Sequence, residues 1–138
     1  MIMAEQSAVA PAEIEVKLRV RYPECDPIGV AHHSVYAVWM EIARTELLRR
    51  RGTPYSELEK RGIFFVVARM QIRYRKPARY DDALRVIARH LPRQSIKVEH
   101  EYEIYRNNEL LADAATTLVC VDRAGRPQRI PEDIFVVG

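Results

Sequence analysis

Apolar and polar residues alternate along several stretches of the chain, and this pattern predicts strands that bury one face. In residues 13–21, Ile14, Val16, Leu18 and Val20 stand between charged neighbours. The chain has further strand-like stretches, in which apolar and β-branched residues recur with the same period. These predicted strands cover residues 63–74, 83–91, 95–105 and 110–121.

Between the first two predicted strands the period changes to that of a helix. In residues 34–51 the apolar positions recur every three or four residues, which is the spacing of one helix face. Ser34 is placed to cap the start of this helix, and Gly52 follows its end. The expected apolar face consists of Val35, Val38, Trp39, Ile42, Ala43 and Leu47.

Short connections join the predicted elements. Residues 54–60 indicate a short helical turn, residues 77–82 a turn, and Asn107–Asn108 a hairpin turn. Residues 130–137 are expected to form a short final element. One strand, one long helix and several antiparallel strands make an α+β fold. We expect a loose tail over residues 1–12 and a single domain over residues 13–138.

Composition narrows the class of protein. The chain has 138 residues and a net charge of +3, with no long run of like charges, so no nucleic-acid partner is indicated. No apolar run approaches the roughly 20 residues that a membrane-spanning helix requires. The two cysteines, Cys25 and Cys120, lie far apart and lack metal-site spacing. We therefore expect reduced thiols, a cytoplasmic location and no bound metal.

The run from Tyr22 to His33 carries the candidate chemistry. It brings a carboxylate (Asp26), a loop glycine (Gly29) and an imidazole (His33) to the start of the predicted long helix. The first N–H groups of a helix are unpaired and carry partial positive charge. This arrangement is typical of a site where negative charge develops on a substrate oxygen.

These residues also carry a family resemblance. The first motif is Tyr22-x-x-x-Asp26-x-x-Gly29-x-x-x-His33-x-x-Tyr36, followed by Trp39-x-Glu41-x-Ala43-Arg44. The second is Tyr74-x-x-Pro77-x-x-x-Asp81-Asp82-x-Leu84. Together they resemble the 4-hydroxybenzoyl-CoA thioesterase family, including its branch encoded beside the Tol-Pal envelope system. That family has the hotdog fold, in which a curved antiparallel sheet wraps one long central helix.

The resemblance implies an acyl-CoA thioesterase. No metal or redox cofactor is expected, because the sequence contains no cluster of metal ligands. Asp26 matches the carboxylate that acts as nucleophile or general base, and His33 matches a position whose backbone N–H helps form the oxyanion hole. Tyr22 matches a tyrosine beside the carboxylate, while Gly29 and His32 are candidate substrate contacts. The family also implies a homodimer or homotetramer with the site between subunits. The acyl group is left open.

Other interpretations stay open at the level of sequence. Asp26 is also a common type of turn residue, Glu41 is a rival catalytic acid, and Cys25 is a rival nucleophile. His33 with Glu41 would suit a dehydratase or hydratase acting on acyl thioesters, and a non-catalytic acyl-CoA binding module is a third alternative. A basic cluster could hold the phosphates of coenzyme A or be a solvated turn; it consists of Arg73, Arg75, Lys76 and Arg79.

Overall fold

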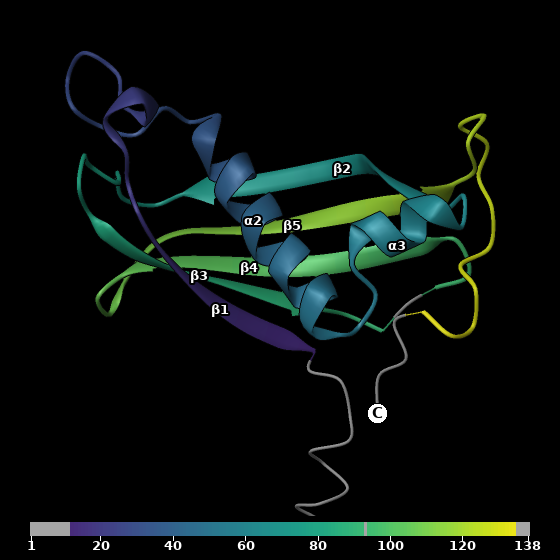
Figure 1. Ribbon diagram of the computed structural model, residues 1–138. Helices are drawn as coiled ribbons and strands as arrows, with labels where there is room; N and C mark the ends of the chain where they lie inside the picture. The colour runs from purple at the N-terminus through teal and green to yellow at the C-terminus, as the bar shows by residue number, and fades with distance from the viewer. Residues whose placement is uncertain (1–11, 93, 135–138) are drawn as a thin grey trace, which may run out of the picture.

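One long helix lies across one face of a five-stranded antiparallel sheet (Figure 1). In this computed structural model, residues 12–92 and 94–134 are described. The strands are ordered β1-β3-β4-β5-β2 across the sheet, so that β1 and β2 form its two edges. Their bounds are β1 Glu13–Arg19, β2 Phe64–Tyr74, β3 Ala83–His90, β4 Lys97–Arg106 and β5 Glu109–Val121.

The helices follow the predicted periods closely. The long helix α2 spans Val35–Arg50 and the short α3 spans Tyr55–Lys60, while a single 3-10 turn, η1, covers Tyr22–Glu24. Asn107 has a positive φ of 55° in the hairpin that joins β4 to β5, as its residue type predicts. The α+β class expected from the sequence is therefore confirmed, with the bounds shifted by one or two residues.

Three expectations need correction or fall partly outside the described residues. Residues 130–134 form no strand or helix within the described part of the chain, where Ile130 and Ile134 are simply buried. The rest of that predicted element, and nearly all of the predicted tail, lie outside the described residues. Ser34 occupies the N-cap position, but its side chain makes no cap hydrogen bond.

The buried face of α2 is rotated relative to the one predicted. Trp39, Ala43 and Leu47 are buried as expected, and Tyr36 and Met40 join them. In contrast, Val38 and Ile42 remain 48% and 43% exposed. The reason is that α2 packs chiefly against β1 and β3, so its opposite side points away from the core.

The core consists of two buried clusters. The larger lies between α2 and the sheet and includes Trp39, Met40, Leu84 and Tyr102. The smaller lies beneath α3 and includes Leu58 and Leu118. No helix in the described part of the chain is long and apolar enough to cross a membrane.

Candidate active site

The loop from Cys25 to Ala31 closes on itself ahead of α2. Cys25 and Ala31 pair as an isolated antiparallel bridge, and the Asp26 N–H donates to the Val30 carbonyl at 2.9 Å. The Gly29 N–H donates to the Asp26 carbonyl, also at 2.9 Å. Gly29 has φ of 88°, and a Cβ there would meet no atom within 4 Å. Glycine is therefore favoured at this position by backbone conformation and not by crowding.

One oxygen of the Asp26 carboxylate is hydrogen-bonded within this loop. Its Oδ1 accepts hydrogen bonds from the Ile28 N–H at 3.0 Å and the Val30 N–H at 3.2 Å. Among the described residues, no partner is found for Oδ2. The turn role and the catalytic role proposed for Asp26 are thus compatible, because one oxygen orders the loop and the other remains available.

A buried carboxylate fastens this loop to α2. The Oε1 of Glu24 accepts the Arg21 N–H at 2.7 Å, and its Oε2 accepts the Trp39 indole N–H at 3.2 Å. Burial alone would raise the pKa of Glu24, but the hydrogen bonds from Arg21 and Trp39 outweigh it and lower the pKa below its ordinary value. The His32 N–H donates to the Glu24 carbonyl at 2.8 Å, so the same residue also holds the far side of the loop.

The turn before β3 holds the loop from its other side. The Ala31 N–H donates to the Ala78 carbonyl at 2.8 Å, and Val30 bridges Arg79. The Ala78 N–H in turn donates to the buried Tyr36 hydroxyl at 3.1 Å. The second sequence motif therefore packs beside the first. Two segments that are far apart in the sequence come together at the candidate site.

His32 and Ser34 form a local hydrogen-bonded pair at the start of α2. The Ser34 N–H donates to His32 Nδ1 at 3.2 Å, and the Ser34 Oγ lies 2.7 Å from the same nitrogen. Because Nδ1 accepts a backbone N–H, we infer that the ring proton sits on Nε2. The Ser34 hydroxyl, which was expected to cap the helix, therefore contacts the imidazole of His32 instead.

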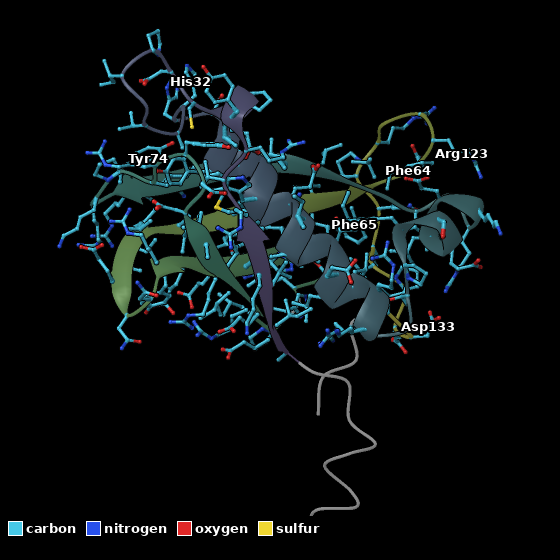
Figure 2. All side chains as sticks on the ribbon, turned by 60° about the vertical axis from the view of Figure 1, so that its left-hand side comes forward. His32, Phe64, Phe65, Tyr74, Arg123 and Asp133 are labelled. Atoms are coloured by element: carbon cyan, nitrogen blue, oxygen red, sulfur yellow. The ribbon has the colours of Figure 1, made fainter. Side chains whose placement is uncertain are left out.

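His33 lies just before α2. Its carbonyl accepts the Tyr74 hydroxyl at 2.9 Å, while its N–H has no partner among the described residues. Its ring is exposed and packs at a tilt against that of His32, with centroids 4.2 Å apart. Figure 2 shows His32 and Tyr74 at the same end of the molecule.

Tyr22 is brought to the same end but not to Asp26. Its ring is 77% exposed and packs edge-to-face on Tyr80, with centroids 5.5 Å apart. In the described part of the chain its hydroxyl makes no hydrogen bond to Asp26, and its catalytic role stays a prediction. The sequence analysis gave no role to Glu24. The one hint in the sequence was its place, as a carboxylate residue between the first strand and the helix that carries Trp39.

The rival groups are poorly placed for catalysis. Glu41 is exposed on α2 and pairs with Arg44 at 3.5 Å, the ordinary helix pair expected from the sequence. Burial and the neighbouring carboxylates Glu24 and Asp26 raise the pKa of the Cys25 thiol, which makes its thiolate scarce. No group of three metal-ligating side chains occurs in the part of the chain that the structure describes.

Most of the basic cluster is neutralised by carboxylates. Asp113 pairs with Arg75 at 2.8 Å and with Arg73 at 3.4 Å, and Glu109 pairs with Lys76 at 2.7 Å. Arg79 differs, because within residues 12–92 and 94–134 its guanidinium has no partner. It follows Ala78 directly and lies across from Val30 in the Asp26 loop.

Comparison with known proteins shows what this chain resembles. The family model described as the thioesterase-like superfamily matches residues 20–135. The acyl-CoA thioester hydrolase YbgC of Escherichia coli O157:H7 is 33% identical over 119 residues, covering 85% of this chain and 89% of that protein.

Solved structures of thioesterases are also similar to this chain. A DHNA-CoA thioesterase from Staphylococcus aureus superposes with a TM-score of 0.81 at 28% identity, over 85% of this chain and 80% of that one. A thioesterase complexed with coenzyme A and Zn from Thermus thermophilus gives 0.75 at 31% identity, over 87% of each chain. With a family match across most of its length and a relative of similar extent, the chain belongs to the thioesterase-like superfamily.

Proposed function

We propose that this thioester hydrolase cleaves acyl-CoA thioesters to a free acid and coenzyme A, with Asp26 as nucleophile or general base. The observation that carries the proposal is the Asp26 carboxylate, which is held through Oδ1 and has no described partner at Oδ2. The names of relatives of similar length support the substrate class. The free thiols of Cys25 and Cys120 suit a cytoplasmic protein.

Thioester hydrolysis needs few groups, which fits such a site. An oxygen must attack the carbonyl carbon, the oxyanion must be stabilised, and the thiolate must leave. A thiolate is a good leaving group, so a strong general acid is unnecessary. Asp26 supplies the attacking oxygen or activates water. The His33 N–H at the start of α2, which has no partner among the described residues, donates to the oxyanion. Gly29 shapes the loop, while a direct substrate contact of His32 stays a prediction.

We also propose that two copies pair through β2, so that the site lies near the interface. An edge strand with exposed apolar side chains invites pairing with another strand. On β2, Val66, Val67 and Met70 are 48%, 45% and 42% exposed. Tyr74, at the end of the same strand, bonds to His33 and thus links this edge to the candidate site. In a homodimer, the backbone N–H and C=O groups of this edge would pair with those of the second copy. A homotetramer would add a second interface between dimers.

The resemblance to the Tol-Pal branch stays a prediction, as does the role of Tyr22. For the nucleotide part of the substrate we propose Arg79 as a phosphate contact, because arginine is suited to phosphate and its guanidinium is not engaged by a described carboxylate. The exposed Glu41 is paired with the buried Arg44, which does not support the dehydratase interpretation.

The test is thiol release from short, long and aromatic acyl-CoA thioesters, with wild type and Asp26→Asn side by side. Asparagine keeps an oxygen for the Ile28 and Val30 N–H groups but removes the charge, so the loop is expected to persist. We expect turnover to fall at least ~100-fold. Retained turnover in the variant would overturn the role of Asp26. Hydration of an enoyl thioester, or binding without turnover, would favour one of the alternatives.

A further inference from the structure

The peptide unit between His33 and Ser34 is held at both ends. Its carbonyl, on His33, accepts the Tyr74 hydroxyl at 2.9 Å. Its N–H, on Ser34, donates to His32 Nδ1 at 3.2 Å. The two supporting side chains come from different elements, because Tyr74 ends β2 whereas His32 precedes α2. This peptide is therefore fixed independently of the regular hydrogen bonds of the helix.

The neighbouring peptide unit carries the proposed oxyanion donor. The His33 N–H belongs to the peptide between His32 and His33, and it has no partner among the described residues. Only the φ and ψ angles of His33 separate the two peptide planes. Fixing the plane of the His33–Ser34 peptide thus limits the directions in which the His33 N–H points. A hydrogen-bond donor must point at the position of the developing oxyanion to stabilise it.

Tyr74 is itself held in place. Its ring packs edge-to-face on that of Tyr36, with centroids 5.0 Å apart. Tyr36 is buried and its hydroxyl accepts the Ala78 N–H, which ties it to the turn that also receives the Ala31 N–H. The chain of contacts therefore runs from the core through Tyr36 and Tyr74 to the His33 carbonyl.

We infer that Tyr74 and His32 are positioning residues that clamp the His33–Ser34 peptide and so aim the His33 N–H at the substrate carbonyl oxygen. This rests on the proposed function, because it assigns a purpose to the same oxyanion hole. Tyr74 acts through the backbone of His33 and contacts no reacting atom. Ser34 has a supporting part, since its hydroxyl lies 2.7 Å from the same Nδ1 of His32.

Two sets of variants test the clamp. Tyr74→Phe removes only the hydroxyl, and Tyr105→Phe on β4 is the matched control. His32→Ala removes the acceptor for the Ser34 N–H, whereas His32→Asn restores one, because an asparagine oxygen accepts the N–H two residues ahead. The measurements are kcat and KM on one acyl-CoA and the hydrogen-exchange rates of the His33 and Ser34 amides.

We expect Tyr74→Phe to lower kcat about tenfold with KM nearly unchanged, since a misaimed donor weakens only the transition-state interaction. His32→Ala should speed Ser34 amide exchange and lower kcat, and His32→Asn should reverse both effects. The double variant Tyr74→Phe/His32→Ala should lose less than the product of the single effects, because both groups hold one peptide.

Failure of the clamp and failure of the proposed function give different results. If Asp26→Asn is inactive but Tyr74→Phe keeps wild-type kcat, the clamp is wrong while the proposed function stands. Recovery of Ser34 amide protection in His32→Asn without recovery of kcat would also overturn it, because the peptide would be held without consequence for turnover. If wild type hydrolyses no thioester, the proposed function fails, and unchanged amide exchange in His32→Ala would overturn the clamp on its own.

Discussion

The indole N–H of Trp39 donates to the buried carboxylate of Glu24 across 3.2 Å, and this bond joins the Asp26 loop to the long helix. Glu24 receives two further hydrogen bonds from Arg21, one from the backbone and one from the guanidinium. Hydrogen bonds to charged groups contribute about 1.5–3 kcal/mol, and loss of a partner leaves the other buried and unsatisfied.

The first prediction concerns this bond. Trp39→Phe should lower the free energy of unfolding by about 3 kcal/mol, and Glu24→Gln by about 2 kcal/mol. The two losses should be less than additive in a double-mutant cycle followed by urea unfolding. Glu57→Gln, which removes an exposed helix pair with Lys60, is the control and should change stability by under about 0.5 kcal/mol. Additive losses would contradict a direct coupling.

The second prediction concerns a buried imidazole far from the site. Burial, helped by the charge of Arg51, lowers the pKa of His90 to about 4 from 6.5. The unfolded chain takes up a proton near pH 6.5, whereas the folded protein does so only near pH 4. Stability should therefore fall as the pH is lowered through this window, by at most about 3 kcal/mol, and this residue should contribute no pH dependence above it.

Denaturant midpoints of wild type and His90→Gln between pH 7 and pH 4 provide the measurement. The difference in stability between the two proteins should shift in favour of the variant as the pH falls. The adjacent His100, whose pKa is also held well below its usual range by burial and by His90, should behave as His90 does. Parallel curves for all variants would refute the assignment.

The third prediction concerns Gly29. Its φ of 88° lies in the left-handed region, and a side chain there meets strain but no collision. Gly29→Ala should cost about 1 kcal/mol of stability and lower kcat, while Gly29→Asn should cost less because asparagine tolerates this conformation. Thermal unfolding and kcat of both variants decide the matter. Equal effects of alanine and asparagine would show that conformation is not the reason for glycine.

The fourth prediction concerns Arg79. If it contacts a phosphate of coenzyme A, Arg79→Ala should raise KM for an acyl-CoA about fivefold, as for a partly solvated charge contact of about 1 kcal/mol. The same variant should leave KM unchanged for the matching acyl-pantetheine thioester, which lacks the nucleotide. Lys97→Ala, on β4, serves as control. An equal change for both substrates would place Arg79 outside the nucleotide site.

The fifth prediction concerns assembly through β2. Met70→Lys places a charge among the exposed apolar side chains of that edge, and should convert the proposed dimer to monomer in analytical ultracentrifugation at micromolar concentration. Ile28→Lys is the control, because Ile28 is 79% exposed but lies outside β2. A dimer that survives Met70→Lys, or a wild type that is monomeric, would count against pairing through this strand.

Local periodicity was sufficient to predict most elements. The alternation over residues 83–91 became β3, and the helical spacing over residues 34–51 became α2, because each pattern fits only one type of element. The exposure of Val38, Ile42 and Met70 could not be predicted, because it depends on the position of β2 at the edge of the sheet and on which strands α2 covers.

The loop geometry at the candidate site was predictable where the motif itself determines it. The Asp26 loop and the positive φ of Gly29 follow from local turn chemistry. The contacts of Tyr74 with His33 and of Trp39 with Glu24 join residues 41 and 15 positions apart, so no local pattern signals them. Ser34 was misassigned as a cap, because its Oγ accepts no N–H of α2 and instead lies 2.7 Å from Nδ1 of the neighbouring His32.

The way Asp26 is held also leaves one position of the loop open to evolutionary variation. Ile28 contributes its N–H to the Asp26 carboxylate, while its side chain is 79% exposed. Any residue except proline supplies that N–H. The side chain at position 28 is therefore able to drift in size and charge beside the candidate site without loosening the carboxylate.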